Sequence, residues 1–211
     1  MSNHYNAKIA LEALKVSFVD NETSLDLKKF IIAYKELMKF FDHLGKVFGF
    51  VVHDISDKFH KIEKTIAKDA PNNNYATVHS AIEYEKANDI YMKEKKVTLS
   101  LLRLMRGLDF LRKFIEAIYY NQNTPKKSHE LAWEVYEQTL AFRHKHMVRS
   151  LVKTGVHLLP KKQELYLKLT YGAEGTNFDD LFKDFSNTLE KAYSILYKLY
   201  NDNNFLELVL A

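Results

Sequence analysis

Apolar side chains recur every three to four positions along almost the whole chain, which is the spacing of one face of an α-helix. Alternation of apolar and polar residues, the pattern of a half-buried strand, never runs beyond four residues. The pattern predicts helices over residues 6–19, 75–91, 95–120, 128–143, 144–159, 161–170 and 178–201, and helical stretches before and after a bend at residues 44–49. We therefore expect an all-α fold of about eight helices without strands.

Residues with turn and capping chemistry mark several helix ends. The run Pro-Asn-Asn-Asn at residues 71–74 predicts a loop, as does the segment 121–127 with its proline. Thr23 and Ser24, followed by Asp26, give an N-cap signal for the second helix, and Asn177 is the expected cap of the last helix.

Composition supports the helical prediction. The 211 residues include only six Gly and three Pro, and an all-β fold needs more of these turn residues. A hydrophobic content of 46% is that of a globular protein, and we expect residues 1–211 to form a single domain. The formal net charge of +4 is small for a nucleic-acid-binding protein, and the aromatic residues lie mostly at core spacing, so we expect no nucleic-acid partner.

The chain contains no cysteine, which excludes disulfides and thiolate chemistry and is compatible with a reducing compartment. The N-terminal segment lacks the basic and apolar regions of a signal peptide, and no apolar run approaches the ~20 residues of a membrane-spanning helix. Motifs of hydrolases, phosphate-binding loops, dinucleotide sites and zinc proteases are absent from the sequence. We accordingly expect neither a cofactor nor an enzymatic activity.

The chain uses arginine for only five of its 31 basic residues, so each arginine needs an explanation. Arg112 falls on the polar stripe of the predicted helix 95–120, and Arg106 falls at the edge of this stripe. Arg103 lies about 60° further round, among Leu99 and Phe110, where a charge is costly unless paired. One interpretation is structural: the side chain extends its charge to water or forms an ion pair. The other is that Arg103 is part of an anion-binding site.

Residues 53–61 place two sets of polar groups on a predicted helix. Asp54, Lys58 and Lys61 share one face beside an apolar stripe. This face is either a solvated surface or a polar recognition patch at the rim of an apolar site. His53, Asp57 and His60 share another face and could bind a divalent ion, although no further ligand is evident.

His144 follows Leu140 by four residues and precedes Val148 by four, which predicts that it lies on an apolar helix face. Such a histidine is either a hydrogen-bonded residue of the core or a donor to a bound ligand.

Three segments occur in an order that resembles the glycolipid transfer protein superfamily. They are Leu44-Gly45-x-Val47-Phe48 with Asp54-Ile55-x-x-Lys58-x-x-Lys61, then Leu102-Arg103-Leu104-x-Arg106-Gly107-Leu108-x-Phe110, and then Tyr136-Glu137-x-x-Leu140 with His144 sixteen residues before Pro160. The resemblance covers roughly residues 25–205. It implies a two-layer helical sandwich around an apolar pocket, which holds one sphingolipid and carries it between cytosolic membrane faces without catalysis.

The resemblance also implies roles for individual residues. Asp54 would accept a hydrogen bond from the sphingolipid amide, and His144 would donate one to the amide carbonyl. Lys58, Lys61 and Arg103 would face the head group. Arg106 and Leu99 are nearby supporting positions on the helix of Arg103. We expect the sphingolipid as the ligand, a transient peripheral contact with membranes, a cytosolic location and no metal.

The head-group positions combine features of two kinds of family member. Glycolipid-selective members resemble one another in having an Asn and a sugar-stacking Trp where this chain has Lys58 and Arg103. Members that carry ceramide-1-phosphate have cations at both positions, but also an Arg where this chain has Leu99. Lys61 matches the glycolipid type, and His146 replaces an interfacial Trp.

We therefore expect a sphingolipid transfer protein that favours a phosphate head group. Transfer of a neutral glycolipid, a sphingolipid sensor that moves little cargo, and an enzyme on a helical scaffold are the alternatives. Lys58 and Arg103 argue against the glycolipid, because neither side chain offers the flat apolar face of an indole.

Overall fold

The structure is a computed structural model of the chain, and it describes residues 4–44, 49–93 and 96–208. The described elements are α1 (Ala7–Val16), β1 (Phe18–Val19), β2 (Ser24–Leu25), α2 (Leu27–Leu44), α3 (Gly49–Asp69), α4 (Val78–Ala87), α5 (Val97–Tyr120), α6 (Ser128–Thr139), the 3-10 turn η2 (Ala141–Arg143), α7 (His146–Val156), α8 (Lys162–Leu169) and α9 (Phe178–Asp202). The predicted all-α fold is confirmed. Most of the predicted bend at residues 44–49 lies outside the described residues.

The first helix is shorter than predicted, because the chain turns at its C-terminal end. α1 ends at Val16, and β1 and β2 follow as an antiparallel ribbon. Asp20, Asn21 and Glu22 all have φ values between 54° and 64° and reverse the chain between the strands. The prediction of a fold without strands is wrong for this ribbon, since strands of two residues are too short to show an alternating pattern.

Helix starts follow the capping chemistry of the sequence. The side chain of Asn177 accepts a hydrogen bond from the backbone N–H of Asp180 at 3.2 Å, as predicted for the start of α9. Before α2 the capping side chain is Asp26, which accepts from the backbone N–H of Lys29 at 2.8 Å.

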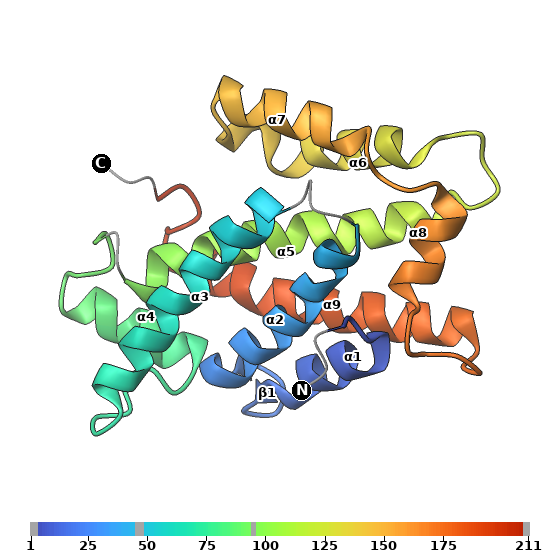
Figure 1. The fold of residues 1–211 in the computed structure, drawn as a ribbon. Coiled ribbons are helices and arrows are strands. Elements are labelled where there is room, and N and C mark those ends of the chain that lie inside the picture. Colours follow the sequence, from blue (N-terminus) through green and yellow to red (C-terminus); the bar gives the residue numbers. More distant parts are fainter. Residues whose placement is uncertain (1–3, 45–48, 94–95, 209–211) are drawn as a thin grey trace.

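α5 is the central helix of the fold. It packs against α6, α9 and α3, while α1 packs against α2 and α9. Figure 1 shows α6 and α7 lying over α5, with α1 and α9 toward the opposite side of the molecule. One continuous group of buried apolar residues connects these helices.

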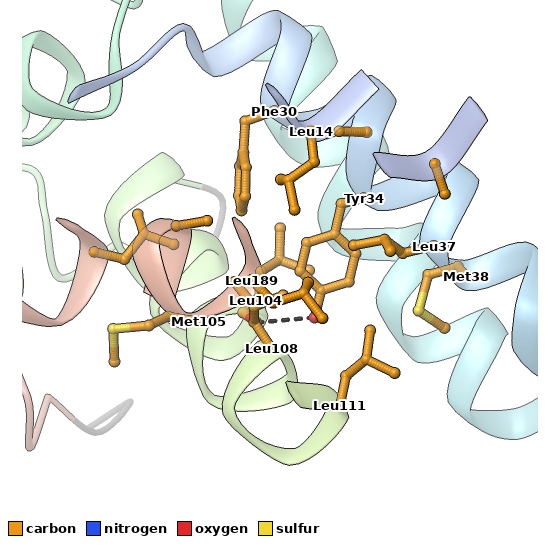
Figure 2. Close-up of a cluster of buried hydrophobic side chains, with 14 of the residues drawn as sticks. Leu14, Phe30, Tyr34, Leu37, Met38, Leu104, Met105, Leu108, Leu111 and Leu189 are labelled. Carbon is orange, nitrogen blue, oxygen red and sulfur yellow. Dashed lines mark hydrogen bonds between the residues drawn. The ribbon is translucent and has the colours of Figure 1, made fainter. Parts of the chain in front are cut away.

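A contact between the Tyr34 side chain of α2 and the backbone of α5 explains the glycine in the Arg-Gly-Leu segment. The buried hydroxyl of Tyr34 donates a hydrogen bond to the carbonyl of Leu104 at 2.9 Å (Figure 2). A Cβ atom on Gly107 would lie 2.9 Å from the Tyr34 hydroxyl, which is too close. Glycine at this position therefore leaves room for the Tyr34 hydroxyl of α2 to reach the backbone of α5.

A buried carboxylate fixes the start of α5. Glu85 of α4 accepts hydrogen bonds from the backbone N–H groups of Val97 at 2.9 Å and Thr98 at 2.8 Å, and from the Thr98 hydroxyl at 2.6 Å. These N–H groups have no partner inside the helix, so Glu85 acts as a helix cap supplied by a neighbouring helix.

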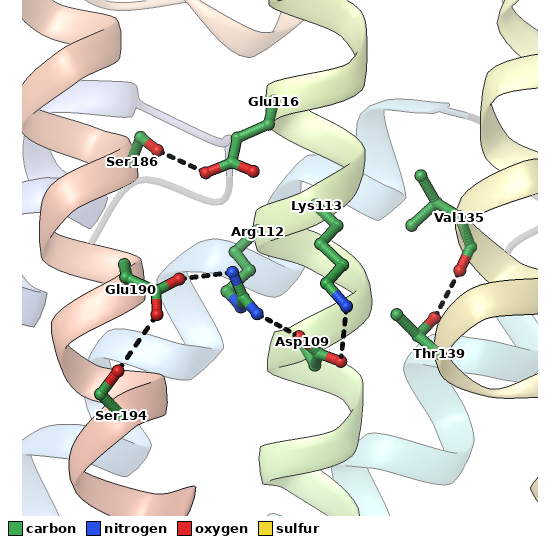
Figure 3. A network of polar contacts seen from close by, with 9 residues as sticks. All are labelled: Asp109, Arg112, Lys113, Glu116, Val135, Thr139, Ser186, Glu190 and Ser194. Carbon is green, nitrogen blue, oxygen red and sulfur yellow. Dashed lines mark hydrogen bonds and ion pairs between the residues drawn. The ribbon is translucent and has the colours of Figure 1, made fainter.

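One ion pair within α5 and one between α5 and α9 account for Arg112. Its guanidinium pairs with Asp109 at 2.7 Å and with Glu190 (Figure 3). It also lies over the ring of Tyr193. Arg112 is thus an arginine in structural ion pairs.

Candidate functional site

A cavity of about 540 Å³ lies among α2, α3, α5, α6, η2 and α7. Its volume falls in the range of about 300–1,000 Å³ that small-molecule sites occupy. Most of the lining is apolar and comes from Tyr34, Met38, Phe41, Leu44, Val51, Ile55, Phe110, Leu111, Phe114, Ala132, Tyr136, Leu140, Val148, Val152, Val156 and Leu159. The charged and polar lining residues are Asp54, Lys58, Arg103, Arg106, Arg143 and His144.

Asp54 and Lys58 form an ion pair across one turn of α3. The two side chains differ sharply in exposure, because Lys58 is only 6% exposed while Asp54 is 70% exposed. A lysine ammonium carries three donors, and Asp54 is its only hydrogen-bond partner among the described residues. Lys58 is therefore a buried cation at the cavity wall with donors left for a ligand.

Arg103 lines the same cavity from α5, near Gly107, Phe110 and Phe114. This is the apolar setting that the helical wheel predicts for it. Within the described part of the chain no hydrogen bond or ion pair of its guanidinium is found. A half-buried guanidinium without a partner favours the anion-binding interpretation over that of a structural ion pair.

Burial and neighbouring positive charges disfavour the charged form of Arg106. Burial, and then the positive charges of Arg143 and Arg103, lower its pKa to about 10, while Glu207 acts in the opposite direction. Its guanidinium donates to the carbonyl of Leu206 at 2.7 Å, but its buried Nε has no partner in the residues described. An anion in the cavity would relieve both the repulsion and the missing hydrogen bond.

Arg143 is the cavity cation to which the sequence analysis gave no role. It forms a two-pronged ion pair with Glu207, with distances of 2.9 Å and 2.8 Å, and lies over the ring of Phe142. Its position directly before His144 in the sequence was the available indication that it belongs to the site. Its partner Glu207, 64 residues away, gave none.

His144 lines the cavity, but it does not lie on a helix face. Its φ of −102° and ψ of 137° are extended, and it joins η2 to α7. The prediction of a helical His144 is wrong because the chain leaves the helix after Thr139, at a point without Pro or Gly to mark it. Nδ1 of His144 lies 2.9 Å from the hydroxyl of Tyr136. Burial lowers the pKa of His144, and the charge of Asp54 partly opposes this effect.

Two of the expected site residues are not part of the cavity lining. Lys61 pairs with Asp57 at 2.8 Å on the same helix. Leu99 is buried near the start of α5. The cavity thus brings together Asp54, Lys58, Arg103, Arg106 and His144, but not these two residues.

The alternative metal site is not supported by geometry. Across residues 4–44, 49–93 and 96–208, no three His, Cys, Asp or Glu residues are placed to hold a metal ion. His53 and His60 are both exposed, and Asp57 is engaged by Lys61, which lowers the pKa of that carboxyl.

Beside the cavity, α7 presents apolar and basic side chains to the surface. Met147 and Leu151 are exposed there, as are His146 and Arg149. Trp133 of α6, to which the sequence analysis gave no role, packs near Tyr136, with its ring centroid 5.4 Å away. No helix in the described ranges is long and apolar enough to cross a bilayer.

An all-α fold around an apolar cavity with several cations in its wall defines a helical binding protein. The profile of the family described as "Glycolipid transfer protein (GLTP)" matches residues 25–171, and the chain belongs to this family. The ceramide-1-phosphate transfer protein of Danio rerio is 27% identical over 214 residues, covering 99% of this chain and 100% of the relative. That of Rattus norvegicus is 26% identical and covers 97% of this chain and 96% of the relative.

Solved structures have the same fold. The crystal structure of the apo-form of mouse ceramide-1-phosphate transfer protein matches with a TM-score of 0.85 and 24% identity, covering 97% of this chain and 100% of that one. The human protein in complex with 12:0 ceramide-1-phosphate matches with a TM-score of 0.83 and 21% identity, with the same coverage.

Proposed function

We propose that this protein binds a sphingolipid with a phosphate head group, of the ceramide-1-phosphate type, and transfers it between membranes without catalysis. The observation that carries the proposal is the cavity itself. Among the described residues its wall holds four cations, Lys58, Arg103, Arg106 and Arg143, but only one carboxylate, Asp54, within a mostly apolar lining. A phosphate with two hydrocarbon chains matches this combination of charge and apolar surface.

The head group would bind to the buried ammonium of Lys58 and to the guanidinium of Arg103, which has no partner in the described chain. Charge-assisted hydrogen bonds of this kind are about twice as strong as neutral ones. Arg106, with its unpartnered buried Nε, would add a further donor.

The sphingolipid amide would lie between Asp54 and His144. The exposed carboxylate of Asp54 has acceptor sites beyond its pair with Lys58, so it can accept the amide N–H. His144 uses Nδ1 for Tyr136, which leaves Nε2 for the amide carbonyl. The hydrocarbon chains would occupy the apolar part, where each buried methylene is stabilised by about 0.8 kcal/mol relative to water.

A neutral glycolipid fits the cavity less well. Arg103 provides no indole on which a sugar could stack. Lys61, the feature that resembles glycolipid-selective members, is engaged by Asp57 away from the cavity. The relatives named ceramide-1-phosphate transfer proteins also support the phosphate head group.

The proposal of transfer without catalysis follows the relatives, which are named as transfer proteins. We further propose a cytosolic protein that touches membranes transiently, which agrees with a sequence free of cysteine and with the exposed apolar and basic side chains of α7.

Native mass spectrometry of the protein purified from cells tests this function. The expected result is a co-purified lipid with the mass of a ceramide phosphate. A co-purified hexosylceramide would support the glycolipid alternative, and a glycerolipid would contradict recognition of the sphingolipid amide. A Lys58→Ala variant purified in parallel is expected to retain less of the phosphate lipid, because the buried ammonium is lost.

A further inference from the structure

The segment Phe205–Leu208, after α9, crosses two of the cavity arginines. The carbonyl of Leu206 accepts from Arg106 at 2.7 Å, and the carboxylate of Glu207 accepts from Arg143 at 2.9 Å and 2.8 Å. Both arginines line the cavity, whereas Leu206 and Glu207 do not. Two of the four cavity cations are thus already in contact with groups of the chain's own C-terminal segment.

This segment is anchored in the fold. Phe205 is buried and stacks on Tyr91 with ring centroids 4.6 Å apart. Glu207 itself is 77% exposed, and Arg143 is its only ion-pair partner in the described chain. The carboxylate can therefore leave Arg143 by a side-chain rotation, without disturbing the anchor at Phe205.

The two groups of the C-terminal segment that accept hydrogen bonds from these arginines differ in charge. The Leu206 carbonyl is neutral, so Arg106 has no ion-pair partner in the described chain, although the charge of Glu207 also acts on it at longer range. Glu207 carries a full negative charge and engages both terminal nitrogens of Arg143, which is the geometry in which a guanidinium also binds a phosphate. Glu207 is thus placed as a carboxylate that imitates an anionic ligand.

We propose that Glu207 is a specificity-determining residue that competes with the lipid phosphate for Arg143. The inference rests on the proposed function. In the empty protein Glu207 neutralises Arg143. A phosphate monoester, which carries more negative charge than a carboxylate, displaces Glu207, and its return to Arg143 promotes release of the head group at the acceptor membrane. A neutral sugar offers no charge that could displace it.

The direction of the effect distinguishes this role from a purely structural one. If Glu207 competes with the ligand, its neutralisation strengthens phosphate binding. If Glu207 only holds Arg143 in a productive position, its neutralisation weakens phosphate binding, because Arg143 then loses its orientation.

The test uses a ceramide-1-phosphate with a fluorescent acyl chain, titrated from phosphatidylcholine vesicles, and four variants of the full chain. Glu207→Gln removes the charge and keeps a similar shape, and Arg143→Gln removes the guanidinium. The third variant combines both changes. Glu22→Gln is the matched control, because Glu22 is an exposed carboxylate paired with a lysine, Lys191, and does not line the cavity.

We expect Glu207→Gln to bind the phosphate lipid roughly 2- to 5-fold more tightly and to release it correspondingly more slowly. This factor corresponds to the free energy that an exposed ion pair contributes. Binding by Glu22→Gln should equal that of the unchanged protein. In the Arg143→Gln background the Glu207 substitution should have a smaller effect, because only its longer-range attraction to Arg106 remains. Binding of a monohexosylceramide with the same fluorophore should not change.

Equal binding by the Glu207→Gln and Glu22→Gln variants would overturn the competition, as would weaker binding by Glu207→Gln or an effect that persists undiminished without Arg143. In these cases the unchanged protein still binds the phosphate lipid, so the proposed function stands. If neither the unchanged protein nor any variant binds the phosphate lipid, the proposed function and the competition both fail.

Discussion

The hydroxyl of Tyr136 lies 2.9 Å from Nδ1 of His144, and this contact leaves Nε2 as the imidazole nitrogen available to a ligand. Burial raises the pKa of Tyr136 and lowers that of His144, so at neutral pH a protonated phenol faces a neutral imidazole. If the phenol donates to Nδ1, the imidazole proton is on Nε2, where it can be donated. The proposed bond to the sphingolipid carbonyl requires this tautomer.

Removing the His144 imidazole should weaken the binding of every sphingolipid, whatever its head group. An unpaired polar group in a site closed to water costs about 1–3 kcal/mol, so His144→Leu should lower affinity by roughly 5- to 150-fold for phosphate and sugar cargo alike. His60→Leu is the control, because this exposed histidine of α3 does not line the cavity. Binding titrations with both lipids measure the effect. A loss confined to one cargo would show that His144 recognises the head group instead of the amide.

Replacing the head-group cations should affect phosphate cargo selectively. One charge-assisted hydrogen bond contributes about 1.5–3 kcal/mol, so Arg103→Leu and Lys58→Ala should each weaken ceramide-1-phosphate binding by roughly 10- to 150-fold and neutral glycolipid binding by less. Lys61→Ala is the matched control on the same helix, since Lys61 pairs with Asp57 and does not line the cavity. If Lys61→Ala weakens binding as much as Lys58→Ala, the assignment of the head-group site from the cavity is wrong.

The lowered pKa of His144 predicts a pH-dependent stability. Unfolded His144 takes up a proton as the pH falls through about 6.5, while the folded residue resists protonation until a lower pH because it is buried. Its contribution to stability is therefore complete above pH 6.5 and is lost as the pH falls through the folded pKa. Urea unfolding at pH 7.5 and 5.5 should show a smaller loss for His144→Gln than for the unchanged protein. An equal or larger loss in the variant would contradict the shift.

Glu85 should be essential for stability although it is far from any ligand chemistry. Glu85→Ala leaves the buried N–H groups of Val97 and Thr98 without acceptors, at about 1–3 kcal/mol each, so the free energy of unfolding should fall by at least about 2 kcal/mol. Glu83→Ala, an exposed change on the same helix, should shift it by less than about 0.5 kcal/mol. Urea denaturation compares the two variants, and equal stabilities would exclude the capping role.

Much of the fold could be predicted from the sequence, because buried helix faces impose a repeat that is visible in single residues. Asn177 marks the start of α9, as predicted. The two-residue strands after Val16 could not be predicted, because a strand of this length shows no repeat. The end of the helix before His144 could not be predicted either, because the surrounding residues continue the helical spacing.

The site shows where helical spacing ceases to be informative. Lys58 and Lys61 lie three residues apart on the same predicted face of α3, and the packing of α3 against α2 and α5 decides which of them lines the cavity. Arg143 was visible as a rare arginine, but its pairing with Glu207 joins residues far apart in the chain. Spacing within one helix cannot predict such a contact.

The cargo preference can also be reversed by design. Arg103→Trp combined with Lys58→Asn replaces two cations by a stacking surface and a neutral donor and acceptor. This double variant should gain transfer of a monohexosylceramide and lose transfer of ceramide-1-phosphate. A variant that loses both while remaining folded by circular dichroism would show that these two positions do not set the preference.

The central claim is that the cavity cations select a phosphate head group on a sphingolipid. The most direct measurement is vesicle-to-vesicle transfer by the unchanged protein, with ceramide-1-phosphate and a monohexosylceramide of the same acyl chain in parallel. The account predicts that ceramide-1-phosphate moves faster. It is contradicted if the hexosylceramide moves as fast or faster, because Lys58 and Arg103 would then be cations that attract the protein to anionic membranes, not ligands of the cargo.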